Sequence, residues 1–163
     1  MIPVVLILLG ALVVAYPVGA TFYNNYRQHE VASDYSSKVS EVDSHDLADD
    51  LARAKQYNAT LPKGLIHDPW KPADEAQQTA YKAYLGELDS MGAMARIRLP
   101  SIRVELPIYH GTSDDTLARG VGHLFGSTLP IGGPGTHAVL TGHSSLATAT
   151  MFDHLPDVRK GKT

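Results

Sequence analysis

The longest apolar segment of the chain lies at its N-terminus. No charged residue occurs between residues 2 and 26, and residues 2–20 are almost continuously apolar. An α-helix rises about 1.5 Å per residue, so a run of this length is sufficient to cross a bilayer. Tyr16, Tyr23 and Tyr26 lie where an interfacial aromatic belt is expected. The pattern therefore predicts a transmembrane anchor over residues 1–26.

A cleaved signal peptide is the competing interpretation of this segment. Val18, Gly19 and Ala20 are small residues at which signal peptidase could cut. No basic residue precedes the apolar run, however, so the basic n-region of a signal peptide is absent. We therefore favour an uncleaved anchor, whose orientation the positive-inside rule does not determine.

A helical period follows the anchor. The apolar positions recur at steps of three and four residues at Val31, Tyr35, Val39, Val42, Leu47, Leu51 and Ala54. This stripe predicts a surface-packed helix broken near Ser44, with Asp43 or Ser44 as the cap of its second part. Three prolines and a glycine predict a loop over residues 61–72, and a short helix is expected over residues 74–88. Residues 27–92 thus form a helical segment that contains a loop.

The period changes to alternation after residue 92. Residues 93–99 and 103–109 alternate between apolar and polar side chains, and residues 136–141 are a third strand candidate. The connections are rich in glycine and proline, which is typical of a β-meander or barrel rather than of βαβ units. No closing strands follow, and open sheet edges are normally avoided. We therefore expect residues 93–163 to be a partial β-barrel without its C-terminal strands.

Charge and cysteine content exclude several classes of protein. The chain has 17 acidic and 14 basic residues and no basic stripe interleaved with aromatic residues, so we expect no nucleic-acid partner. The complete absence of cysteine excludes disulfides and cysteine-based zinc sites.

Metal and nucleotide sites are weakly supported. Five of the eight histidines lie between residues 110 and 154, but no His-Glu-x-x-His motif occurs. His137 and His143 would be about 20 Å apart on an extended strand, too far for one ion. Gly161, Lys162 and Thr163 imitate the end of a Walker A motif, but Pro156 stands where its first glycine is required. We expect neither a metal nor another cofactor.

His143 is the strongest candidate for chemistry. It follows Thr141 and Gly142 at the end of a predicted strand, where glycine allows a substrate or a neighbouring chain to approach closely. A histidine there can titrate near neutral pH and donate or accept a proton. For His123 and His137 we favour a structural role, with hydrogen bonds to the backbone.

Several short motifs occur in a set order along the chain. They are Asp-Pro-Trp (68–70), Leu-Pro-Ile-Tyr-His-Gly-Thr (106–112), Gly-Val-Gly-His-Leu (120–124), Leu-Pro-Ile-Gly-Gly (129–133) and Thr-Gly-His (141–143). Together with the N-terminal anchor and the helical segment, this series resembles the class C, pilus-assembling sortases of Gram-positive bacteria. The resemblance implies a mainly β fold with N-terminal helices: a sortase-like β-barrel, here incomplete, preceded by a transmembrane helix.

The resemblance also implies an activity and a set of site residues. Sortases are cysteine transpeptidases whose thiolate attacks the Thr–Gly bond of Leu-Pro-x-Thr-Gly-type sorting signals, and in this class a pilin lysine resolves the thioacyl intermediate. His143 would protonate the departing amine, and an arginine would stabilise the oxyanion. In the lid loop, Asp68 would pair with that arginine and Trp70 would cover the sulfur. The implied partners are pilin or cell-wall protein sorting signals and the cell membrane, with the domain on its extracellular face.

The chain also departs from the family pattern. The family's cysteine and arginine belong to strands that would lie beyond residue 163, and Ser144 and Ser145 replace the usual Arg-Gly. Our leading hypothesis is therefore the N-terminal portion of a class C sortase, inactive alone. The alternatives are a non-catalytic, membrane-anchored module that binds sorting signals or a partner subunit, and complementation by a separate cysteine-bearing chain.

Overall fold

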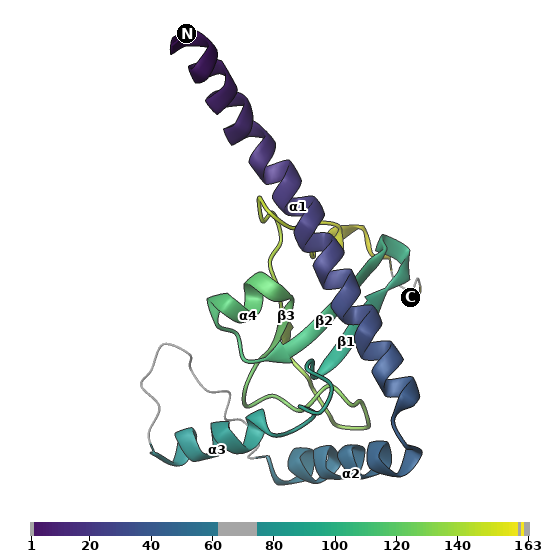
Figure 1. The fold of residues 1–163 in the computed structure, drawn as a ribbon. Helices are drawn as coiled ribbons and strands as arrows, with labels where there is room; N and C mark the ends of the chain where they lie inside the picture. Colours follow the sequence, from purple (N-terminus) through teal and green to yellow (C-terminus); the bar gives the residue numbers. More distant parts are fainter. Residues whose placement is uncertain (1, 62–74, 160, 162–163) are drawn as a thin grey trace.

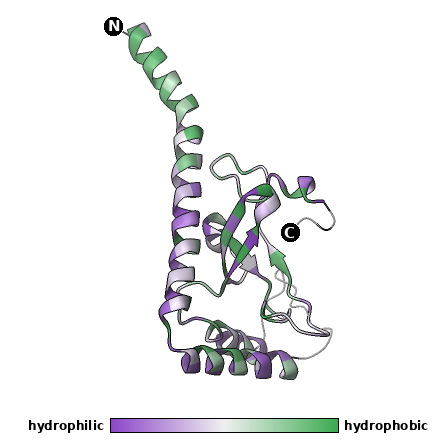
Figure 2. Ribbon diagram, turned by 90° about the vertical axis from the view of Figure 1, so that its right-hand side faces the viewer, coloured by the Kyte–Doolittle hydropathy of each residue, from purple (hydrophilic) through white to green (hydrophobic). Residues whose placement is uncertain are grey.

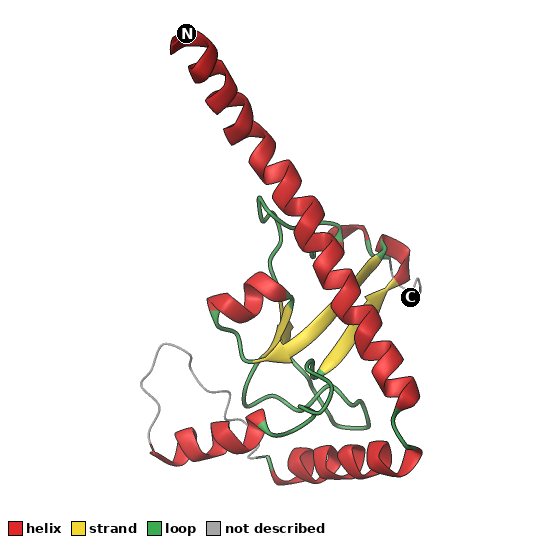
Figure 3. Cartoon of the chain, in the orientation of Figure 1, coloured by secondary structure: helices red, strands yellow, loops and turns green. Residues whose placement is uncertain are grey.

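A long helix and a small sheet dominate the computed structural model, which describes residues 2–61, 75–159 and 161 (Figures 1 and 3). The elements in chain order are α1 (Ile2–Glu41), α2 (Ser44–Thr60), α3 (Glu75–Leu85), β1 (Ala95–Leu99), β2 (Val104–His110), α4 (Asp114–Arg119), β3 (Val121–His123) and β4 (Leu140–Thr141), with short 3₁₀ turns at Pro100–Ile102 and Leu155–Asp157. The sheet order among these residues is β1-β2-β3-β4.

Helix α1 has two parts with different surroundings. Its N-terminal part projects beyond the rest of the molecule and exposes its apolar side chains, as the green end of the helix shows (Figure 2). Its C-terminal part packs against β2 and buries Gln28 and Ala32. The helix is long and apolar enough to cross a membrane. It runs without a break through residue 26, where the sequence analysis placed the end of the anchor.

The break between the first two helices is confirmed. The side chain of Asp43 accepts a hydrogen bond of 2.8 Å from the backbone N–H of His45, so Asp43 is the N-cap of α2. Helix α3 ends at Leu85, three residues earlier than predicted. The backbone leaves helical geometry soon afterwards, because Leu88 has a positive φ of 55°.

The expected meander is wrong at the second connection of the sheet. Strands β1 and β2 form the predicted antiparallel pair, with Ala95 opposite Ile108. Strand β3 was not predicted, and it pairs with β2 in parallel after the short crossover helix α4. Strand β3 has only three residues, all of them buried and one of them glycine, so its sequence cannot show the alternation of apolar and polar side chains that predicts a strand.

The third predicted strand is much shorter than expected. Only Leu140 and Thr141 of residues 136–141 belong to β4, which pairs antiparallel with β3. Two side-chain hydroxyls occupy backbone N–H groups that a longer ladder would need: Thr128 accepts from the N–H of His137, and Ser127 accepts from that of Val139. Such side-chain bonds compete with regular pairing.

A buried polar cluster ties α3 to the sheet. The Tyr84 hydroxyl donates to the carbonyl oxygen of His123 at 2.9 Å, lies 3.0 Å from its Nδ1, and accepts from the N–H of Gly111 at 3.0 Å. The Nε2 of His123 is 2.8 Å from the carbonyl oxygen of Thr128, so this nitrogen carries the donated proton. Both rings are fully buried. This Tyr84–His123 cluster therefore joins α3, the end of β2, β3 and the 124–139 loop.

Replacing Tyr84 by phenylalanine tests the cluster. The variant keeps the ring but leaves buried groups of Gly111 and His123 without a partner, so the free energy of unfolding should fall by about 2–4 kcal/mol. Tyr81→Phe is the matched control on the same helix, because the Tyr81 hydroxyl makes no hydrogen bond to a described residue. Thermal melts of the detergent-solubilised chain measure both variants. Equal, small effects would contradict a structural role for the Tyr84 hydroxyl.

The same cluster predicts a loss of stability in acid. Burial lowers the pKa of His123 from its ordinary value, so the folded chain keeps this imidazole neutral while the unfolded chain binds a proton. The contribution is complete above about pH 6.5 and declines as the pH falls below that value, at up to about 1.4 kcal/mol per pH unit. The melting temperature measured from pH 8 to pH 5 should fall more steeply for the wild-type chain than for His123→Gln. Parallel curves would contradict this prediction.

Candidate functional site

His143 lies just beyond the end of β4, at the start of a loop. Its side chain is half-buried, and its ring makes no hydrogen bond within residues 2–61 and 75–159. Its carbonyl oxygen accepts a hydrogen bond of 3.1 Å from the N–H of Phe152, which closes the base of the loop formed by residues 144–151. The backbone of His143 is thus held while its imidazole is available to a substrate.

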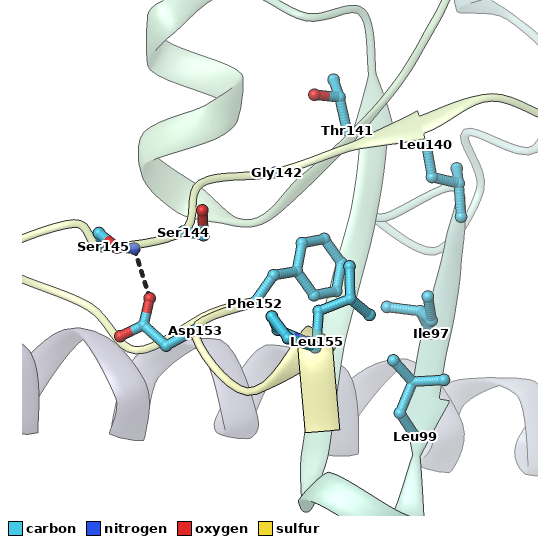
Figure 4. Close-up of a pocket in the computed structure, with 11 residues that line it drawn as sticks. Ile97, Leu99, Leu140, Thr141, Gly142, Ser144, Ser145, Phe152, Asp153 and Leu155 are labelled. Carbon is cyan, nitrogen blue, oxygen red and sulfur yellow. Dashed lines mark hydrogen bonds between the residues drawn. The ribbon is translucent and has the colours of Figure 1, made fainter. Parts of the chain in front are cut away.

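An open pocket of about 690 Å³ begins beside His143, and the residues on either side of it in the chain, Gly142 and Ser144, both line this pocket. Five apolar side chains gather around the hollow from β1, β4 and the C-terminal segment (Figure 4): Ile97, Leu99, Leu140, Phe152 and Leu155. The pocket reaches from β1 to β4, the two strands at the edges of the sheet. An apolar surface here suits an extended peptide or a further strand.

Gly142 is required by the packing of Phe152. A Cβ atom at position 142 would lie 2.7 Å from Cε2 and 2.9 Å from Cδ2 of the Phe152 ring. The ring occupies the space that a side chain would need, so the glycine before His143 allows Phe152 to form one wall of the pocket.

The loop after His143 is internally braced. Leu146 and Ala149 form an isolated antiparallel bridge, and the N–H of Ser145 donates to a carboxylate oxygen of Asp153 (Figure 4). Ser145 has a positive φ of 61°, a conformation that is uncommon for a residue other than glycine and that the bond to Asp153 helps to hold. The loop is therefore held in one conformation by its own hydrogen bonds.

Helix α1 holds this loop from outside. Thr21 donates to the carbonyl oxygen of Ala147 at 3.1 Å, and Asn24 donates to that of Thr148 at 2.9 Å. Asn25 makes two hydrogen bonds to Thr150: its Nδ2 donates to the hydroxyl at 2.8 Å, and its Oδ1 accepts from the backbone N–H at 3.0 Å. We call these four bonds the α1 clamp.

The predicted lid residues Asp68 and Trp70 lie outside the described residues, so only His143 of the three predicted site residues has a place in the structure. The other histidines have different surroundings. His123 belongs to the Tyr84–His123 cluster, and the Nε2 of His110 lies 2.7 Å from the carbonyl oxygen of Glu87, whereas His137 is exposed. In the part of the chain that the structure describes, no three His, Asp or Glu side chains form a group that could hold a metal ion.

The polar residues of the α1 clamp were not predicted from the sequence. The clamp residues directly follow the apolar run: they are Thr21, Asn24 and Asn25. The interpretation of this segment as an aromatic belt rested on the tyrosines and gave these three residues no role. Two adjacent asparagines on a helix are a weak signal for a tertiary contact, because asparagine has a low helix propensity. Their partners lie more than 120 residues later.

Comparison with known proteins identifies the family of this chain. The family model for the sortase domain matches residues 97–163. A solved structure of sortase A from Corynebacterium diphtheriae is 41% identical, with 87% of this chain and 68% of that chain covered and a TM-score of 0.63. This chain belongs to the sortase family. A search of the curated proteins finds no match.

Class C members of the family are among the similar structures. Sortase C-1 from Actinomyces oris is 52% identical over 72% of this chain, with a TM-score of 0.64. Sortase C1 from Streptococcus agalactiae is 34% identical over 82% of this chain, with a TM-score of 0.68. The present sortase chain spans 65% of the Actinomyces structure, less than two thirds of its length. The class C resemblance and the sortase fold expected from the sequence are confirmed, and the sheet of the described residues is small and open.

Removing the side chain of Asn25 tests the α1 clamp. Asn25→Ala loses both bonds to Thr150, so amide hydrogen exchange of residues 146–150 should accelerate by about tenfold or more. Ser33→Ala is the control on the same helix, because Ser33 is exposed and its hydroxyl has no hydrogen-bond partner among the described residues. Unchanged exchange in Asn25→Ala would show that the loop holds its conformation without α1.

Proposed function

We propose that residues 1–163 are the histidine-bearing part of a membrane-anchored class C sortase that joins pilin subunits through Leu-Pro-x-Thr-Gly-type sorting signals. The observation that carries the proposal is the position of His143 beside an apolar pocket at an unpaired strand edge, in a chain of the sortase family. These residues contain no cysteine, so they have no thiol of their own for transpeptidation.

The unpaired edge of β4 is suited to pair with a further strand that would carry the cysteine. Within the described residues, β4 has a partner on one side alone, which is β3. A strand added to its other edge would lie about 4.8 Å away. A cysteine on that strand would then lie close enough to His143 for proton exchange directly or through one water molecule. We propose that sequence outside residues 1–163 supplies this strand, together with an arginine.

His143 acts as acid and then as base in the proposed reaction. The cysteine thiolate attacks the threonine carbonyl carbon of the sorting signal, and the C–N bond to glycine breaks. Imidazolium at His143 gives its proton to the departing amine, and a thioester remains. Neutral His143 then accepts a proton from the pilin lysine amine that attacks the thioester, which releases the thiolate and forms an isopeptide bond.

The remaining proposed roles are a lid over the active site and an anchor in the membrane. Asp68 and Trp70 would form the lid, with Asp68 paired to the arginine and Trp70 over the sulfur. The apolar part of α1 would anchor the sortase in the cell membrane, with the domain on the extracellular face. The α1 clamp supports this arrangement, because it links the end of the anchor to the loop that follows His143.

Cleavage of a fluorogenic Leu-Pro-x-Thr-Gly peptide tests the proposal. Residues 1–163 alone should show no cleavage above background. A chain extended through the downstream reading frame, with its cysteine and arginine, should cleave the peptide, and His143→Ala should reduce that rate by at least about 100-fold because the general acid is lost.

Three outcomes would contradict this proposal. They are cleavage by residues 1–163 alone, an extended chain that is indifferent to His143→Ala, and downstream sequence without a sortase cysteine. In the third case, peptide affinity without cleavage would favour a non-catalytic binding module. Activity that appears only on mixing with a second, cysteine-bearing chain would favour complementation.

A further inference from the structure

A second pocket lies between α1, β2 and α4, away from His143. Its volume is about 340 Å³. Helix α1 forms one wall with a single face of residues spaced three and four apart, and the other wall comes from the end of β2 and from α4. The polar and aromatic lining residues are Tyr23, Asn24, Arg27, Gln28, Tyr109 and Arg119. We call this space the Arg27–Arg119 pocket.

The pocket offers donors that the protein leaves unused. The guanidinium carbon of Arg119 lies 4.6 Å from the centre of the Tyr109 ring, and its Nε donates to the carbonyl oxygen of Asp115. The two outer nitrogens of Arg119 donate to no described residue. Gln28 is 5% exposed, and its buried Nε2 has no hydrogen-bond partner among the described residues. A buried amide donor without an acceptor costs about 1–3 kcal/mol, which an acceptor in the pocket would offset.

Tyr109 adds a further donor between the two arginines. Burial raises the pKa of its phenol, and the nearby charges of Arg119 and Arg27 act in the opposite direction. The phenol therefore stays protonated at neutral pH and can donate. Two guanidinium groups, a buried amide and a phenol surround one space whose lining residues include no carboxylate, which is typical of a site for an oxyanion.

One carboxylate competes for this site. Glu30 accepts a hydrogen bond of 2.7 Å from Arg27, and both side chains are about half exposed. Such an exposed pair contributes little, about 0–1 kcal/mol, so Glu30 can turn to solvent when an anion with a stronger charge binds Arg27. Asp115 lies one helical turn before Arg119 on α4, but its carboxylate forms no ion pair with Arg119 among the described residues.

The depth of the pocket indicates the source of the anion. Arg27 is the first charged residue after the apolar run. It lies seven residues beyond Ala20, or about 10 Å along the helix. The headgroup layer of one leaflet is about 5–8 Å thick. If α1 crosses the membrane with Ala20 at the edge of the hydrocarbon, Tyr23 lines the pocket about 4.5 Å further along the helix, within the headgroup layer. Arg27 lies just beyond this layer, and its Cα–Cβ bond is tilted back toward the helix N-terminus. The hydrophilic part of the helix begins in this region (Figure 2).

We propose that the Arg27–Arg119 pocket binds the phosphate of an anionic membrane phospholipid, with Arg119, Gln28 and Arg27 as the donors. This inference rests on the membrane anchoring within the proposed function and goes beyond it. A bound headgroup would link α1 to β2 and α4 on the C-terminal side of the α1 clamp. It would thereby fix the height of the domain above the bilayer.

Short-chain lipids added to the detergent-solubilised chain test the proposal. Thermal stabilisation is measured with dihexanoyl phosphatidylglycerol, with dihexanoyl phosphatidylcholine and with sodium phosphate. We expect phosphatidylglycerol to bind about tenfold more tightly than phosphatidylcholine, because only the former leaves its phosphate charge uncompensated. Equal affinity for the two lipids would overturn the proposal, and so would stabilisation by sodium phosphate as large as that by phosphatidylglycerol.

Three variants separate binding from folding. Arg119→Gln should reduce the preference for phosphatidylglycerol to within about twofold, and the control Arg98→Gln, an equal change of charge at an exposed position of β1, should retain it. Gln28→Met should leave the lipid-free melting temperature unchanged or higher, because Nε2 has no partner to lose, and should still weaken the preference. A preference that survives in both pocket variants would overturn the assignment.

Flotation with phosphatidylcholine vesicles reports on the anchor independently. Flotation without a phosphatidylglycerol preference would refute the pocket while leaving the anchor intact. Failure to float would refute the anchor itself.

Discussion

The buried hydroxyl of Tyr84 is the constraint around which the domain is arranged. It bonds to the end of β2 through Gly111 and to β3 through His123, whose ring in turn holds the 124–139 loop at Thr128. These segments share few backbone bonds with one another, and β3 and β4 are very short strands. A fully buried polar cluster has defined geometry, because each donor requires its acceptor. The cluster therefore fixes the direction in which the chain enters β4.

His143 depends on contacts at both ends of the loop that follows it. The sheet and the bond from Phe152 hold the base of the loop, and the α1 clamp holds its outer part. The segment of α1 that carries the clamp, residues 21–25, is consequently a structural part of the candidate site. Under the proposed function, in which His143 is the general acid and α1 the anchor, this would couple the position of His143 to the orientation of α1, and the Arg27–Arg119 pocket would extend that coupling to the lipid headgroups.

Local patterns predicted those parts of the structure that depend on nearby residues. The cap at Asp43 and the β1–β2 pair follow from residues adjacent in sequence, so their patterns were sufficient. Strand β3 and its parallel pairing were missed, because three buried residues carry no period. Residues 136–139 belong to a predicted strand, yet the hydroxyls of Ser127 and Thr128 accept from the backbone N–H groups of Val139 and His137. His143 as the catalytic histidine remains a prediction from the motif order.

The sequence by itself determined that an apolar helix precedes a sortase-type domain, and it placed His143 at a strand end, because hydropathy and motif order are properties of the chain alone. It also determined that residues 1–163 contain no thiol. Only the tertiary structure decided that α1 binds the loop after His143 and that Gln28, whose buried Nε2 has no partner among the described residues, lines a pocket together with two arginines. These contacts join residues about 80 to 125 positions apart, and no local pattern encodes which distant polar groups will meet.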